Sequence, residues 1–187
     1  MNGVPSGEVA RSLFGAWLLL RWNPAGTQFF DGTRGACIRS FWAAAIAAPL
    51  YAVITAISFT PSPSVDPVRV ALVFAIGYVV MWTAFPLAML YVAELLGRSQ
   101  QYFRFIAVYN WAAVLQYTIV LLATIAADLM PPALGAALAF GALVFTLVYE
   151  WFIARTVLQI GLLPAAGVIA VDVVLSLFIN AITQRMG

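Results

Sequence analysis

The sequence contains no histidine, no lysine and a single cysteine, and these gaps exclude several kinds of site. Cys37 has no second cysteine with which to form an internal disulfide. Zinc sites built from the usual Cys and His ligands, and catalytic triads with a histidine base, are excluded as well. Charge is also scarce, because 9% of the residues are Asp, Glu, Lys or Arg, against roughly a quarter in a soluble domain.

Apolar residues make up 64% of the chain, and the mean hydropathy is +1.00. A bilayer core of about 30 Å is crossed by about 20 apolar residues in a helix. Runs of this length predict five transmembrane helices, at about 37–59, 70–96, 102–127, 133–156 and 164–184. The links between them are short, so neighbouring helices should be antiparallel. We therefore expect an all-α bundle that forms a single membrane domain over 1–187.

A shorter segment, 7–22, precedes the first run and is too short to cross the membrane. Its apolar stretch lies between Arg11 and Arg21. In a helix, its polar and small residues form one narrow face opposite its large apolar residues. The two sets are Glu8, Arg11, Ser12 and Gly15, and Phe14, Trp17, Leu18 and Leu20. This pattern predicts an amphipathic helix that lies in the membrane interface.

The arginines predict the orientation of the chain, because short cytoplasmic loops retain cationic residues. With five spans, Arg69 and Arg185 fall on one side of the membrane and the other seven on the opposite side. The N-terminus is therefore expected in the cytoplasm and the C-terminus outside. The cytoplasmic arginines, which we expect to contact lipids or a partner, are Arg11, Arg21, Arg34, Arg39, Arg98, Arg104 and Arg155.

A carboxylate interrupts the last apolar run, in the stretch AVDVVLSLFIN at 170–180. At about 1.5 Å per residue, Asp172 and Asn110 each lie about 12 Å from the cytoplasmic end of their helices. Glu150 lies at the same depth if the fourth helix continues to Leu158. An ionisable group at that depth needs a partner, so Asp172 should face the interior and share a hydrogen bond with one of the other two. The predicted intramembrane polar cluster is Asp172, Asn110, Glu150, Ser176 and Asn180.

Two readings of Glu150 follow from the sequence. If Glu150 meets Asp172, one of them should hold a proton at neutral pH, because two adjacent carboxylates in a low dielectric should not both ionise. Alternatively, the fourth span ends near Phe152, and Glu150 lies in the headgroup zone beside Trp151 with Arg155 as its partner. Asp172 would then pair with another polar group: Asn110, Tyr109, Tyr117 or an arginine.

Prolines and small residues indicate where helices bend or approach closely. Pro49 and Pro86 fall inside the first and second spans, where each removes a backbone hydrogen bond and permits a kink. Small residues recur at four-residue spacing on the fourth helix, which favours close packing of a neighbouring helix from this chain or a second copy. They are Gly135 with Ala139, and Ala137 with Gly141.

No motif of an enzyme is present. The stretch FDGTRGA at 30–36 lacks the downstream paired aspartates that a metal-dependent lipid phosphotransferase needs. No glycine-rich phosphate loop or nucleophile elbow occurs either. We expect no enzymatic activity, no cofactor and no nucleic-acid partner.

Three stretches carry a resemblance to a known family. They are RSFWAAAIAAPLYAVITAI, LGRSQQYFRFIAVYNWAAVLQ and VYEWFIARTVLQIGLLPAAGVIAVDVVLSLFINAI. Over about residues 30–184 the chain resembles the bacterial branch of the Yip family, whose eukaryotic members are Ypt/Rab-interacting membrane proteins. The resemblance implies a five-span bundle that binds partners and shapes membranes without catalysis. Eukaryotic members contact GTPases through a longer N-terminal region that this chain lacks, so a Rab-like partner is not expected.

Two functions from different classes fit these observations. The first is a non-enzymatic protein of the bacterial inner membrane that binds another membrane protein or a second copy of itself, or assists an assembly. The second is a small transporter or proton-coupled channel, in which Asp172 titrates and Pro49 and Pro86 provide flexibility. A lipid-modifying enzyme is disfavoured, because no ion-binding or nucleophilic set is present.

Overall fold

The computed structural model describes residues 6–58 and 66–186, and within these ranges the chain is helical, without strands. Five helices, two of them made of two consecutive elements, are long and apolar enough to cross a membrane, and the described residues in them are 34–58, 67–95, 99–128, 132–158 and 162–185. In order, the elements are α1 (Ser6–Leu20), η1 (Pro24–Phe29), α2 (Arg34–Ser40), α3 (Trp42–Ser58), α4 (Pro67–Leu95), η2 (Ser99–Gln101), α5 (Tyr102–Asp128), α6 (Pro132–Leu158) and α7 (Leu162–Met186).

The all-helical bundle with five apolar helices is confirmed. The helix α6 continues to Leu158, two residues beyond its predicted end, which is the condition under which Glu150 shares a level with Asp172. The predicted end of the first span, Phe59, lies outside the described residues.

The first span is not the single helix expected over 37–59. It consists of α2 and α3, which meet at Phe41. The Ser40 hydroxyl donates a 2.7 Å hydrogen bond to the Cys37 carbonyl. The Phe41 N–H bonds to the Ile38 carbonyl, three residues earlier. These short-range bonds compete with the regular α-helical pattern and break the helix at this point.

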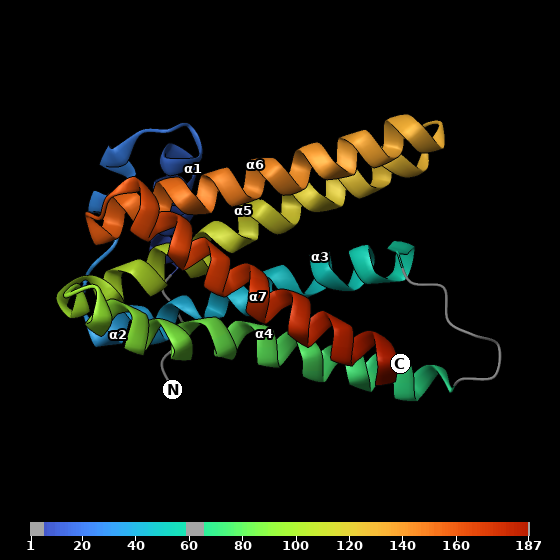
Figure 1. Cartoon of the computed structure of the whole chain (residues 1–187), viewed down its shortest axis with the longest axis horizontal. Coiled ribbons are helices and arrows are strands. Elements are labelled where there is room, and N and C mark those ends of the chain that lie inside the picture. Colours follow the sequence, from blue (N-terminus) through green and yellow to red (C-terminus); the bar gives the residue numbers. More distant parts are fainter. Residues whose placement is uncertain (1–5, 59–65, 187) are drawn as a thin grey trace.

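The long helices run along the long axis of the molecule, and the α5–α6 pair lies close to the α4–α7 pair at one end only (Figure 1). The helix α5 packs against α6 and α3, while α4 packs against α7. Toward the turn between α5 and α6, the α5–α6 pair diverges from the α4–α7 pair (Figure 1). We call this the open end. The opposite end, where α1, η1 and α2 lie, is the packed end.

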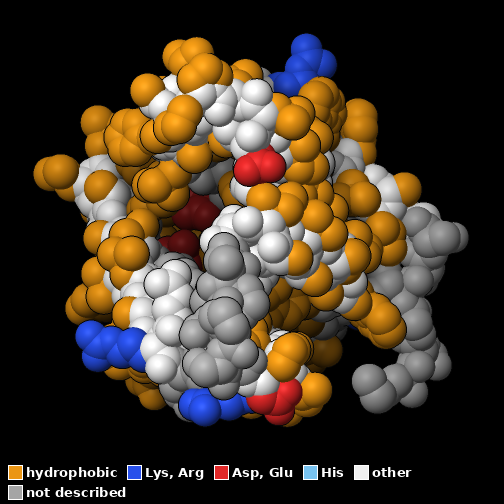
Figure 2. Space-filling model, turned by 90° about the vertical axis from the view of Figure 1, so that its right-hand side faces the viewer, with side chains coloured by type: hydrophobic (Ala, Val, Ile, Leu, Met, Phe, Trp, Pro, Cys, Tyr) orange, Lys and Arg blue, Asp and Glu red, His pale blue; other side chains and the backbone are white. Residues whose placement is uncertain are grey.

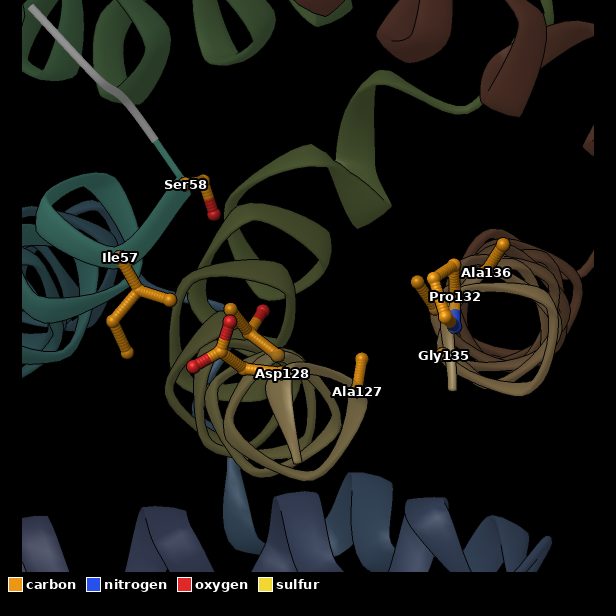
Figure 3. A pocket seen from close by; sticks show the side chains of 9 residues that line it. Ile57, Ser58, Ala127, Asp128, Pro132, Gly135 and Ala136 are labelled. Carbon is orange, nitrogen blue, oxygen red and sulfur yellow. The ribbon is translucent and has the colours of Figure 1, made fainter. Parts of the chain in front are cut away.

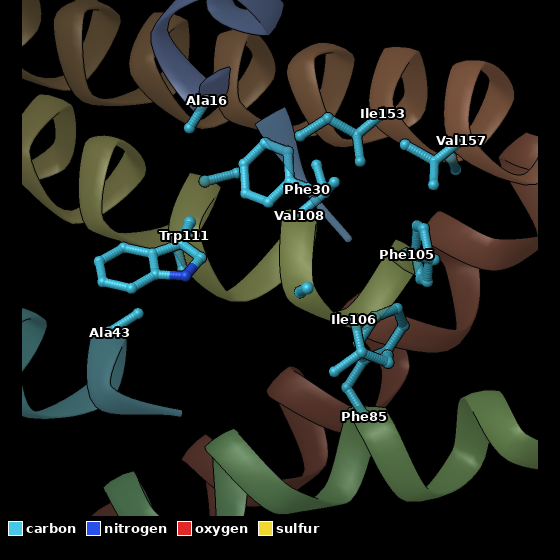
Figure 4. Close-up of a cluster of buried hydrophobic side chains, with 14 of the residues drawn as sticks. Ala16, Phe30, Ala43, Phe85, Phe105, Ile106, Val108, Trp111, Ile153 and Val157 are labelled. Carbon is cyan, nitrogen blue, oxygen red and sulfur yellow. The ribbon is translucent and has the colours of Figure 1, made fainter. Parts of the chain in front are cut away.

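The hydrophobic core fills the packed end. Buried residues of α5 all lie between Phe105 and Gln116, in its first half. Those of α6 lie between Thr146 and Leu158, except for Gly135. Figure 4 shows side chains of several helices and of the N-terminal region converging on this core. They include Ala16, Phe30, Ala43, Phe85, Phe105, Ile106, Val108, Trp111, Ile153 and Val157.

The helix α1 packs into this core through its small residues. A Cβ on Gly15 would lie 2.7 Å from the Cβ of Phe29, and a Cβ on Gly26 would collide with the Gly15 carbonyl. The Tyr149 hydroxyl donates a 2.8 Å hydrogen bond to the Ala16 carbonyl. Two glycines therefore let α1 and η1 touch backbone to backbone.

The faces of α1 differ from the sequence expectation. Ser12 and Gly15, which were placed on a polar face, are buried against the protein. Phe14 and Trp17 are about half exposed, at 51% and 47%. Small size, rather than polarity, selects the packing face, because only small residues allow η1 to approach.

The prolines and one of the small residues have the positions expected. Pro49 lies inside α3 and Pro86 inside α4. Gly135 lets α6 approach α5, because a Cβ there would lie 2.6 Å from the Ala127 carbonyl oxygen. A Cβ on Gly141 would meet nothing within 4 Å. The close approach at Gly135 is thus made within the chain.

Candidate functional site

Two carboxyl groups meet between α6 and α7. The side chains of Glu150 and Asp172 lie within hydrogen-bonding reach of each other, and Asp172 is 9% exposed. The Tyr109 hydroxyl donates a 2.8 Å hydrogen bond to Asp172 Oδ1. Gln116 Nε2 donates a 2.9 Å hydrogen bond to Glu150 Oε1. We call Glu150 and Asp172 the carboxyl pair; α5 supplies a donor to each member.

One oxygen of the pair has no donor. Glu150 Oε2 is buried and has no hydrogen-bond partner among the described residues. Two carboxylate oxygens cannot bond to each other unless a proton lies between them. A proton shared with Asp172 would therefore satisfy Oε2.

Within the described part of the chain, no arginine forms an ion pair with either carboxyl group. The two ion pairs formed by the described residues are Arg11 with Asp31 and Arg39 with Glu8, and both lie at the packed end. The alternative partner of Glu150, Arg155, lies instead over the ring of Trp151, 4.8 Å from its centroid. The alternative in which Glu150 pairs with Arg155 is therefore not realised.

Asn110 belongs to a different network. Its Nδ2 donates a 2.9 Å hydrogen bond to the Ser40 hydroxyl, on α2. Adjacent residues of a helix point about 100° apart, so α5 directs Tyr109 toward Asp172 and Asn110 toward α2. A hydrogen bond between Asp172 and Asn110 was one expectation, and it is not formed. Ser176 is half-buried and Asn180 is exposed on α7.

The partner that sequence reasoning missed is Gln116. Tyr109 was among the alternative partners of Asp172, and Gln116 lies seven residues after it. That spacing returns to nearly the same face of a helix after two turns. A search of α5 at this spacing would have found both donors.

The carboxyl pair lies where the packed half of the bundle ends. Viewed from the open end, the surface has a hollow with acidic side chains at its bottom (Figure 2). Glu150 and Asp172, on α6 and α7, are the acidic residues that lie away from both ends of the bundle. Gln116 and Thr146, which are the last buried residues before the helices diverge, lie at the same level.

Three tyrosine side chains, from three helices, lie against one another, and one of them, Tyr117, reaches the pair. The Tyr51 and Tyr78 ring centroids are 4.7 Å apart, and Tyr117 lies 6.1 Å from the first and 6.4 Å from the second. Tyr117 interacts electrostatically with both carboxyl groups. The Tyr78 hydroxyl donates to the Ala44 carbonyl at 2.6 Å, which fixes that ring in place.

A separate, shallow recess of about 390 Å³ lies at the rim of the open end, between α3, α5 and α6. Ile57, Ser58 and Asp128 line it together with the first turn of α6 (Figure 3). Its only ionisable side chain among the described lining residues is Asp128. It offers a single charge and no enclosure, and it makes no site by itself.

The arginines divide between the two ends as expected. Seven belong to segments at the packed end, while Arg69 and Arg185 lie near the open end. Four of the seven are already engaged, namely Arg11, Arg39, Arg98 and Arg155. The remaining three, Arg21, Arg34 and Arg104, are exposed.

The structure has five helices that are long and apolar enough for a multi-pass membrane protein, and a carboxyl pair is buried between two of them. No protein-family model, no curated protein and no solved structure matches the chain. The resemblance to the Yip family therefore stays a prediction, and function has to be argued from the site.

Proposed function

We propose that the protein is a small proton-coupled transporter, in which the carboxyl pair takes up and releases a proton. The observation that carries this proposal is that two carboxyl groups, without a cation among the described residues to neutralise them, meet in the interior of the bundle. Two unit charges about 4 Å apart repel by about 4 kcal/mol at an effective dielectric of 20. The pair therefore holds one proton at neutral pH and exchanges it through the hollow.

A purely structural role for the pair is less well supported. A polar cluster that only holds helices in register should be fully hydrogen-bonded, because a buried polar atom without a partner costs about 1–3 kcal/mol. Glu150 Oε2 lacks such a partner among the described residues. A proton or a ligand would supply it.

Infrared spectroscopy of the purified protein tests the shared proton. The unmodified chain should show the carbonyl stretch of a protonated carboxyl group at neutral pH. Either Glu150→Gln or Asp172→Asn should remove that band, because the new amide donates to the remaining carboxylate and leaves it charged. Asp128→Asn, the same chemical change at the rim, should keep the band. A chain without the band, or a band that survives both substitutions, would overturn the proposal.

Proton flux provides the second test. In liposomes containing the protein and a trapped pH dye, an imposed pH gradient should collapse faster than in empty liposomes. Both pair variants should lose this difference, and Asp128→Asn should keep it. Equal flux in all proteins would refute a proton-coupled role.

A second candidate is an organising or accessory protein of the bacterial inner membrane, with its N-terminus in the cytoplasm. The exposed arginines Arg21, Arg34 and Arg104 at the packed end support it, because they are available to anionic lipids or a partner. Native purification tests this candidate directly. A partner that co-purifies, and that is lost when the three arginines are replaced by glutamine, would support it; a protein that elutes alone would contradict it.

A further inference from the structure

We propose that the hollow binds an organic ammonium ion, whose N–H groups contact the carboxyl pair and whose carbon atoms pack on the tyrosine rings. This inference rests on the proposed function, since it names the solute that exchanges with the proton. Three observations on the described residues support it: Glu150 Oε2 has no hydrogen-bond partner, no cation pairs with either carboxyl group, and Tyr117 lies next to the pair. The rings of Tyr51, Tyr78 and Tyr117, which contact one another, are called the aromatic wall.

The charge of the site favours a cationic ligand. In the described chain no arginine reaches either carboxyl group, so negative charge in the pair has no counter-charge from the protein. A buried, unpaired charge is costly, and a bound cation removes that cost. An ammonium N–H can also donate to Glu150 Oε2, the one oxygen of the pair that is buried without a partner among the described residues.

The ligand set favours an organic cation over a metal ion. Hard divalent cations take six or more oxygen ligands. Among residues 6–58 and 66–186, no three acidic, cysteine or histidine side chains gather closely enough to hold a metal ion. Two oxygens of the pair are already occupied by Tyr109 and Gln116. An ammonium group is satisfied by fewer acceptors, because it donates directed hydrogen bonds.

The rings of the aromatic wall provide further contacts with the ligand, beyond those of the carboxyl pair. The faces of tyrosine rings attract cations within about 6 Å of their centroids. Tyr117 is half-buried, and it interacts electrostatically with both carboxyl groups. Tyr51 and Tyr78, from α3 and α4, continue the wall from Tyr117. A short alkylammonium ion can therefore place its charge at the pair and its alkyl group against these rings.

Ligand and proton should exclude each other. Each contributes one positive charge, and each needs the same carboxyl oxygens as acceptors. Exchange of one for the other leaves the charge of the buried site unchanged. Binding should therefore release about one proton per ligand, as the charge balance of the site demands.

The probe is propylammonium chloride, titrated calorimetrically into the purified protein in two buffers that differ in ionisation enthalpy. We expect saturable binding and the release of one proton. Sodium chloride at the same ionic strength and neutral propanol should give no saturable heat. Glu150→Gln should abolish binding of propylammonium, and Asp128→Asn should not change it.

Substitutions at Tyr117 test whether the aromatic wall binds the ligand, separately from whether the protein folds. Tyr117→Leu should weaken binding about 2- to 30-fold, the range expected for the loss of one cation–π contact. Tyr117→Phe keeps the ring and should bind within about twofold of the unmodified chain. Tyr91→Leu, at a side chain that is 78% exposed on α4, is the matched control and should have no effect.

The outcomes separate this inference from the proposed function. If the infrared band behaves as expected but propylammonium does not bind, the ammonium class is wrong and proton exchange stands. If propylammonium binds equally well to the Glu150→Gln variant, the carboxyl pair is not the site and the inference is overturned. If sodium competes at equal concentration, the aromatic wall does not select the ligand, and the inference is overturned as well.

Discussion

Replacing Tyr109 with phenylalanine removes the one hydroxyl group that holds Asp172 in place. The bond is 2.8 Å long, and Asp172 is 9% exposed. In soluble proteins a hydrogen bond to a charged group contributes about 1.5–3 kcal/mol. Inside membrane proteins, double-mutant cycles average about 0.6 and reach about 1.7 kcal/mol, because the unfolded chain in the membrane also finds partners. We therefore expect a loss of about 1 kcal/mol. The ring itself, whose centroid lies 4.4 Å from that of Phe85, is retained.

The measurement is reversible unfolding in detergent, carried out as a double-mutant cycle with Asp172→Asn. The coupling energy between Tyr109→Phe and Asp172→Asn should lie between about 0.6 and 1.7 kcal/mol. Tyr91→Phe, at an exposed tyrosine of α4, is the control and should be neutral. A coupling energy near zero, with both single variants destabilised, would refute the bond between α5 and α7.

Three further predictions concern helix packing, a buried hydrogen bond and membrane topology. Gly26→Ala should destabilise the protein by about 1–3 kcal/mol in thermal unfolding, because its Cβ would collide with the backbone of α1; Gly141→Ala, which meets nothing, should not destabilise it. Ser40→Ala should cost about 1–3 kcal/mol in the same assay, because it leaves the buried amide of Asn110 without its acceptor. A reporter that is active only in the cytosol should stay dark when fused after Gly187, and a bright signal would contradict the predicted orientation.

The spans were predictable because their signal is a sum over many residues. Twenty apolar side chains in a row leave few alternatives to a membrane helix, whichever of them is exchanged. The depth argument worked for Glu150 and Asp172 for a similar reason, since a helix has a constant rise per residue. The constant rise predicts the depth of each residue along its helix, and Glu150 and Asp172 do meet at the same depth.

Depth does not predict direction, and this is why the sequence could not decide between Asn110 and Glu150 as the partner of Asp172. Asn110 and Tyr109 lie at almost the same depth and differ by about 100° around the helix axis. Which of them faces α7 depends on how α5 rotates against its neighbours. That rotation is set by the packing of the core, which the apolar sequence of α5 leaves undetermined.

The sequence does not predict the break at Phe41 or the packing of α1, because both depend on contacts with other parts of the chain. A serine inside an apolar run looks like a tolerated polar residue. In the structure the Ser40 hydroxyl donates to the Cys37 carbonyl and accepts a hydrogen bond from Asn110, 70 residues away. In the sequence, Ser12 and Gly15 likewise look like part of a polar face. Their small volume matters only once η1 lies against them.

The hydrogen bond that joins α1 to α6 has a consequence for the biogenesis of the protein. Ala16 and Tyr149, which join α1 to α6, are separated by 133 residues. At a synthesis rate of about 5–20 residues per second, the ribosome reaches Tyr149 roughly 7–27 s after Ala16. The earliest part of the nascent chain therefore waits, undocked, while most of the later helices enter the bilayer. Its half-exposed Phe14 and Trp17 give it a surface with which to rest on the membrane during that interval.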